Sequence, residues 1–151
     1  MVEHKAELGT LIIGYDPDEL LRVFGNELEY LDPNNPLIAD VSAFINSVGT
    51  NADDDLEHRD YLLDDLFEAL DSLAPVLCYF GALENTFDDF GFWPSIDTID
   101  EEVKMARKFG NPTDENDLYL EDYNVWLVIN GDDVAVFEND NGQHGAEIWS
   151  V

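Results

Sequence analysis

Basic residues are scarce in this chain. Its 151 residues include 6 Lys and Arg against 35 Asp and Glu, which gives a formal net charge of -29. A surface this negative repels phosphates, so the sequence argues against direct binding of nucleotides or nucleic acids. Six cations cannot neutralise the acids, and most carboxylates are therefore expected to face water or the cations of a partner. Repulsion among so many negative charges destabilises the compact state, so a property other than stability must favour the high charge density.

Cysteine and long apolar runs are also lacking. The single cysteine, Cys78, lies in the apolar run 74–80, cannot form an internal disulfide, and is expected to be a buried, unreactive thiol. No stretch approaches the roughly 20 apolar residues of a membrane span, and the first seven residues do not resemble a secretory signal. We therefore expect a cytoplasmic protein without membrane contacts, located in the host cytoplasm if a phage encodes it.

Motifs for catalysis or cofactor binding are missing as well. The three histidines, His4, His58 and His144, are accompanied by no nucleophile motif, and zinc would need more His and Cys. The segment 138–142 offers hard oxygen ligands for calcium, but Phe137 occupies the place of the first EF-hand ligand. With so many acids, paired carboxylates carry no information about acid–base chemistry. We expect no enzyme, no cofactor and no dedicated metal site.

Apolar residues, by contrast, are plentiful enough for a packed core. Hydrophobic residues make up 45% of the chain, with nine Phe, six Tyr and three Trp, and no repeat or low-complexity linker divides it. We predict one α+β domain over residues 1–151, with helices in the first half. Helices are expected from Pro17, capped by Asp16, to Leu31, and over 37–48, 53–73 and 98–109.

Strands are predicted in the second half. The runs 76–81 and 90–94 are typical of a hairpin, and the segments 123–130, 134–138 and 146–151 of a three-stranded antiparallel meander with a turn at 131–133 and a loop at 139–145. The segment 87–94 places aromatics among acids, as in exposed interface anchors. The large aromatic residues of these segments are nevertheless expected in the core, because a domain this charged needs its apolar anchors. They are Phe90, Phe92, Trp93, Trp126 and Trp149.

The helix predicted over 53–73 is the most distinctive segment. Its apolar residues recur every three or four positions and predict a core face composed of Leu56, Leu62, Leu63, Leu66, Phe67, Leu70 and Leu73. At about 100° per residue, five carboxylates fall within an arc of roughly 80° on another side. These five residues, here called the acidic row, are Glu57, Asp60, Asp64, Glu68 and Asp71. The row spans roughly 21 Å, with a carboxylate about every 5 Å.

In its charge the chain resembles the acidic DNA-mimic proteins with which phages and mobile elements block restriction enzymes, CRISPR effectors, DNA glycosylases or nucleoid proteins. Its 29 net charges equal those on roughly 50 Å of duplex DNA. The resemblance covers the composition of the whole chain and the acidic row, and no family motif is matched. It implies a stoichiometric inhibitor that binds a basic DNA- or RNA-binding protein or complex and blocks its access to nucleic acid.

The expected contact surface consists of carboxylates. A homodimer with two-fold symmetry would lengthen this surface and suit a long DNA channel. The predicted contact residues are Asp53, Asp54, Asp55, Glu57, Asp60, Asp64, Asp65, Glu68 and Asp71, with Asp88, Asp89, Asp114, Glu115, Asp117, Glu121 and Asp122 as secondary candidates.

Three other interpretations stay open at this point. An immunity protein that neutralises a basic nuclease toxin has the same surface chemistry but a single cognate partner. A protein of an extreme halophile carries such acidity merely to remain hydrated in salt. An enzyme of unknown type would need a pocket with a perturbed titratable group.

Overall fold

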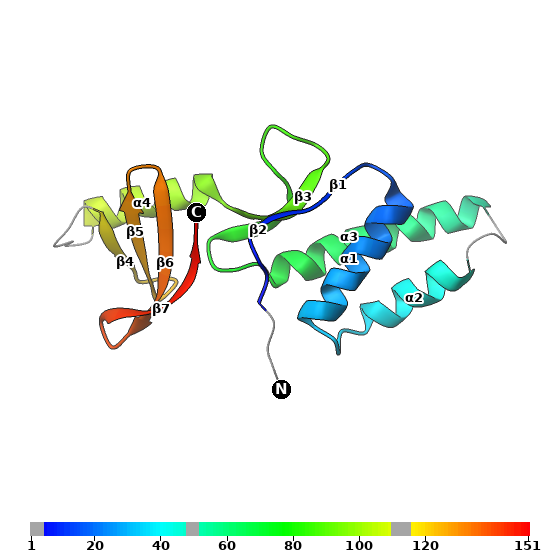
Figure 1. The fold of residues 1–151 in the computed structure, drawn as a ribbon, viewed down its shortest axis with the longest axis horizontal. Coiled ribbons are helices and arrows are strands. Elements are labelled where there is room, and N and C mark those ends of the chain that lie inside the picture. Colours follow the sequence, from blue (N-terminus) through cyan, green and yellow to red (C-terminus); the bar gives the residue numbers. More distant parts are fainter. Residues whose placement is uncertain (1–4, 48–51, 110–115) are drawn as a thin grey trace. The chain divides into compact units, whose positions relative to one another are not determined.

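The computed structural model describes residues 5–47, 52–109 and 116–151, and within these ranges only the backbone of 47, 52–55 and 109. The chain forms two compact units. Unit 1 comprises residues 1–74 and 78–93, and unit 2 comprises 75–77 and 94–151. The α+β fold is confirmed, with most of the helical residues in the first half (Figure 1). The single domain over 1–151 stays a prediction.

The described part of unit 1 contains three helices, α1 (Pro17–Leu31), α2 (Leu37–Ser47) and α3 (Ala52–Ser72). The predicted start of α1 is confirmed, because an oxygen of the Asp16 carboxylate accepts a hydrogen bond of 3.0 Å from the amide of Asp18. Pro17 follows at the first helical position, where its missing N–H is no loss. Both α2 and α3 pack against α1 (Figure 1).

A three-stranded antiparallel sheet completes unit 1. Its strands are β1 (Gly9–Ile13), β2 (Cys78–Ala82) and β3 (Asp89–Pro94), in the order β1-β3-β2. The predicted β2–β3 hairpin is confirmed, whereas β1 was not predicted. A bulge between Thr10 and Ile12 brings the backbone of Gly9 so close to Gly91 that a side chain at position 91 would collide with the Gly9 carbonyl.

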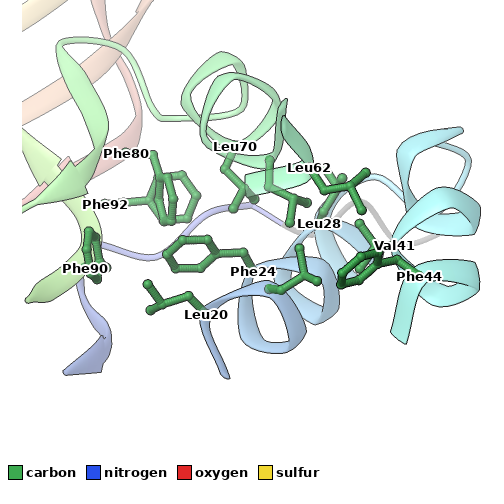
Figure 2. Packing of buried hydrophobic residues seen from close by; sticks show 12 residues of the cluster. Leu20, Phe24, Leu28, Val41, Phe44, Leu62, Leu70, Phe80, Phe90 and Phe92 are labelled. Atoms are coloured by element: carbon green, nitrogen blue, oxygen red, sulfur yellow. The ribbon is translucent and has the colours of Figure 1, made fainter. Parts of the chain in front are cut away.

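Phe24 of α1 occupies the centre of the unit 1 core and is fully buried (Figure 2). Its ring contacts Phe67, Phe80 and Phe90 edge-on, with centroid distances of 5.1, 5.1 and 5.6 Å. The prediction of buried aromatic residues is confirmed for Phe90 and Phe92. These contacts join α1, α3 and the sheet, so this cluster positions α3.

Unit 2 holds α4 (Ile96–Phe109) and a four-stranded antiparallel meander, in the order β4 (Asp117–Leu120), β5 (Val125–Asn130), β6 (Asp133–Asp140) and β7 (Gln143–Ser150). The predicted three-stranded meander is confirmed as β5, β6 and β7, and β4 is an additional strand that was not predicted. The register aligns a row of buried residues across all four strands: Leu118, Leu127, Val136 and Trp149. Helix α4 contacts β4 and buries Ile99 and Val103.

Two further predictions for unit 2 are corrected. The segment 139–145, predicted as a loop, is mostly strand. Only Asn141 and Gly142, which both have positive φ, form the turn between β6 and β7, so the residues on either side of them belong to the strands. Trp126 is half-buried and belongs to the outer face of the sheet, since its neighbours Val125 and Leu127 are buried and successive residues of a strand point to opposite faces.

Residues 75–77 belong to unit 2 although the residues on either side of them belong to unit 1. The indole nitrogen of Trp149 donates a hydrogen bond of 2.7 Å to the carbonyl of Val76. The amide of Ser95 donates one of 2.8 Å to the carbonyl of Leu77. These bonds tie the segment to the end of β7 and to the start of α4.

Candidate protein-binding surface

The acidic row lies on the solvent side of α3, and all five of its residues are exposed. On the other side, Leu62, Leu66 and Leu70 are buried in the core of unit 1. At about 100° per residue, the centre of the acidic row lies roughly 160° around the helix from these leucines. The helix is therefore held by one face and presents carboxylates on the opposite one.

Leu56 does not join the core face predicted for α3, because 48% of it is exposed. Asp65, another predicted contact residue, is exposed but lies about 100° from the centre of the acidic row.

Three members of the acidic row also have partners within unit 1. Glu57 accepts a hydrogen bond of 3.4 Å from the hydroxyl of Tyr61. An oxygen of Asp71 accepts a hydrogen bond of 2.9 Å from the amide of Phe80, which fixes the end of α3 to β2. The guanidinium of Arg59 lies 3.7 Å from Asp60 and 3.4 Å from Asp18, and only 18% of the arginine side chain is exposed. Arg59 thus partly neutralises the row near Asp60, while no partner is recorded for Asp64 or Glu68 among the described residues.

Asp88 and Asp89, two secondary candidates, belong to unit 1 but not to α3. Both are half-buried at the beginning of β3. The Asp89 carboxylate accepts a hydrogen bond of 2.8 Å from the hydroxyl of Thr10, so it helps to fix β1 to β3. One oxygen of Asp89 is therefore occupied by this structural contact.

Asp117, Glu121 and Asp122 lie in unit 2. Asp117 is 2.8 Å from the Nε2 atom of His144, whose imidazole is stacked on the ring of Phe137. Glu121 and Asp122 are exposed in the turn after β4 and line a hollow of about 260 Å³. Three carboxylates and no basic side chain line this hollow, so it does not offer an anion site.

The remaining predicted contact residues lie outside the described part of the structure. Asp114 and Glu115 fall in the range 110–115, and the side chains of Asp53, Asp54 and Asp55 are not described. The six basic residues are divided equally between the units: Lys5, Arg22 and Arg59 in unit 1, and Lys104, Arg107 and Lys108 in unit 2. Each unit is therefore strongly acidic by itself.

Apolar side chains are exposed at the surface of unit 1. Ile13, Tyr15 and Phe87 are largely exposed, and the rings of Tyr15 and Phe87 are in edge-on contact. For Phe87, the position of aromatics among acids in the segment 87–94 is the signal in the sequence for an exposed interface anchor. No such signal marks Ile13 or Tyr15, which are brought to Phe87 by the pairing of β1 with β3.

Among the described residues, burial raises the pKa of three titratable groups, Glu27, Cys78 and Tyr79. Glu27 lines a hollow of about 270 Å³ beside Glu7, and its pKa is raised by burial and secondarily by the charge of Glu7. Burial raises the pKa of the Cys78 thiol to about 12, which disfavours the nucleophilic thiolate. No group of three or more His, Cys, Asp or Glu in the described ranges is arranged to hold a metal ion.

Comparison with known proteins gives no relative: no family model, no curated protein and no solved structure matches the chain. None of the described helices is long and apolar enough to cross a membrane.

Proposed function

We propose that this protein imitates nucleic acid: it binds the basic nucleic-acid-binding surface of a host defence protein, such as a restriction enzyme or a CRISPR effector, and blocks its access to DNA. The observation that carries the proposal is the acidic row on α3. Its carboxylates are exposed on one side of a helix whose opposite side is anchored in a packed core.

The rigidity of α3 supports this proposal. Carboxylates on a flexible acidic tail lose conformational freedom when they bind, whereas the carboxylates of the acidic row are already aligned. A groove lined with Lys and Arg, built to contact successive phosphates, can accept such a row. The attraction is electrostatic, so association is fast and weakens as salt is added.

The charge distribution also supports a protein partner. With a net charge of -29 and no basic residue within the row, the surface repels nucleic acid and attracts proteins that bind it. Carboxylates outside α3 are further candidates for contacts with the partner, although one oxygen of Asp89 already accepts a hydrogen bond within the chain. These secondary candidates are Asp88, Asp89, Glu121 and Asp122.

Affinity capture with a pair of charge-matched variants tests the proposal. The test variant is Asp60→Lys/Asp64→Lys/Glu68→Lys, and the control variant, Asp132→Lys/Asp133→Lys/Glu147→Lys, changes three exposed acids of unit 2. Both have the same net charge, so a difference between them reflects position. Each is immobilised, exposed to bacterial lysate at about 0.1 M salt, and eluted with a salt gradient.

We expect the wild type and the control variant to retain a nucleic-acid-binding protein that competing duplex DNA releases, and the α3 variant to lose it. Equal capture by all three proteins would exclude the acidic row as the contact. Capture of generic basic proteins alone, unaffected by competing DNA, would contradict mimicry. A chain that folds only in molar salt would support halophilic adaptation instead.

A further inference from the structure

The three most exposed large hydrophobic side chains among the described residues lie at one corner of unit 1. Phe87 is 71% exposed, and Ile13 and Tyr15 are both 67% exposed. The rings of Tyr15 and Phe87 meet edge-on, with centroids 5.6 Å apart. We call Ile13, Tyr15 and Phe87 the apolar corner.

The pairing of β1 with β3 brings these residues together. Ile13 is directly opposite Asp89, and the amide of Gly14 donates a hydrogen bond of 2.9 Å to the carbonyl of Asp88. Tyr15 lies two residues after Ile13, and Phe87 lies two residues before Asp89. Continued alternation of side chains beyond the ends of the two strands places both on the same side as Ile13. The apolar corner is thus a product of the fold.

The loop that carries Phe87 is closed by its own hydrogen bonds. It connects β2 to β3 and is drawn in green in Figure 1. The amide and the hydroxyl of Thr86 both donate to the carbonyl of Leu83, at 2.9 and 2.6 Å, and the amide of Leu83 donates to the carbonyl of Asp89 at 2.8 Å. The turn places Asn85 in the left-handed region, with φ of 67°. Phe87 is consequently held in its exposed position before any partner arrives.

Acidic residues, and no basic ones, adjoin the apolar corner. Asp89 lies opposite Ile13 in the strand pair, while Asp16 and Asp88 are the sequence neighbours of Tyr15 and Phe87. The segments 8–20 and 83–92 contain no Lys or Arg. An apolar centre with an acidic rim is complementary to an apolar pocket whose rim is basic.

Single exposed hydrophobic residues are ordinary, but a cluster of three calls for an explanation. Aromatic side chains in the middle of an interface often dominate the binding energy, while charged residues at the rim contribute mainly to steering. The acidic row of α3 supplies the steering but cannot exclude water from an interface. The apolar corner can exclude water from an interface, which the acidic row cannot do.

We infer that the apolar corner is the anchor of the interface, and that it inserts into an apolar pocket surrounded by Lys and Arg on a basic protein partner. This inference rests on the proposed function and deepens it, because it specifies a partner with more than a phosphate-binding groove. The binding free energy then has two contributions. The electrostatic contribution of the acidic row weakens as salt is added, and the hydrophobic contribution of the apolar corner does not.

Two synthetic peptides of equal length, labelled with the same fluorophore, serve as probes. Both contain the same number of arginines, which alternate with leucine in one peptide and with serine in the other. Their dissociation constants are measured by fluorescence anisotropy over a series of NaCl concentrations. The proteins compared are the wild type, Tyr15→Ser/Phe87→Ser, the control Tyr30→Ser and the α3 charge-reversal variant. Tyr30 is a suitable control because it is 52% exposed and lies on α1, outside the acidic row and the apolar corner.

We expect the wild type and the Tyr30→Ser variant to bind the leucine peptide about 30-fold more tightly than the serine peptide, the ratio that corresponds to one hot-spot residue. Tyr15→Ser/Phe87→Ser should lose this preference but keep the salt dependence of the wild type. An unchanged preference in that variant, an equal loss in Tyr30→Ser, or no preference in the wild type would overturn the inference.

The α3 charge-reversal variant separates this inference from the proposed function. It should bind both peptides more weakly, with a shallower salt dependence, and should still prefer the leucine peptide. If its affinity and salt dependence equal those of the wild type, the acidic row has no role and the proposed function fails, whereas the leucine preference reports on the apolar corner alone. Far-UV circular dichroism of every variant verifies that the fold is retained.

Discussion

Replacing Asp64 by lysine should stabilise the protein and weaken its binding at the same time. Asp64 lies at the middle of the acidic row, four residues from Asp60 and four from Glu68. Like charges at this helical spacing destabilise by about 0.2–0.5 kcal/mol per pair, and opposite charges stabilise by a similar amount. Asp64→Lys converts two repulsive pairs into two attractive pairs. The free energy of unfolding should therefore rise by about 1–2 kcal/mol at low salt.

Urea unfolding followed by circular dichroism at 222 nm measures this change, with Asp64→Gln as the control. Gln and Lys have similar helix propensities, so the difference between the two variants isolates the attractive pairs, worth about 0.4–1 kcal/mol. At about 1 M NaCl the screening length falls to about 3 Å, and the difference should vanish. If Asp64→Lys is no more stable than Asp64→Gln at low salt, the carboxylates of the row do not interact. A stabilised variant with reduced partner affinity would mean that the row is maintained for binding.

Three further predictions concern the core and the perturbed groups. Phe24→Ala should lower the free energy of unfolding by about 3–5 kcal/mol in urea titrations, because the ring is fully buried among three others, and a loss below about 1 kcal/mol would contradict this packing. The raised pKa of Glu27 means that the folded state retains the proton more tightly than the unfolded state. Ionisation therefore costs stability as the pH rises above the ordinary value of 4.5, so Glu27→Gln should be more stable than the wild type at pH 7 and equal to it in acid, as measured by urea unfolding across that range. The Cys78 thiol, with its pKa raised to about 12, should resist iodoacetamide at pH 8 until urea unfolds the protein, and rapid labelling of the folded protein would refute its shielding.

Local signals allowed the helices to be predicted from the sequence. Asp16 and Pro17 mark the start of α1, and the repeated leucines of α3 indicate both its extent and its buried stripe. The solvent side of α3 follows from the same periodicity, and the exposure of the acidic row is confirmed. Leu56 was assigned wrongly because periodicity locates a face but does not tell how far along the helix the neighbouring elements cover it.

Non-local pairing accounts for most of what was missed. β1 is paired with β3, about 80 positions later in the chain, and no pattern within Gly9–Ile13 identifies that partner. The short strand β4 lies among acids, which are usually depleted in strands. Trp126 was placed in the core on the strength of its size, but strand alternation puts it opposite the buried row of its sheet. The apolar corner escaped prediction for the same reason as β1.

The assignment of residues 75–77 to unit 2 makes the chain cross between the units three times: after residue 74, after residue 77 and after residue 93. Neither unit is therefore a contiguous segment of the chain, and cleavage at a single position cannot produce two fragments that each contain one complete unit. A fragment that begins at Pro94 lacks the carbonyls of Val76 and Leu77, which accept hydrogen bonds from Trp149 and Ser95. A fragment that ends at Trp93 contains residues 75–77 without these hydrogen-bond partners. Genetic dissection by truncation would therefore damage both halves, and circular permutation or point substitution is the sounder route to assigning a task to each.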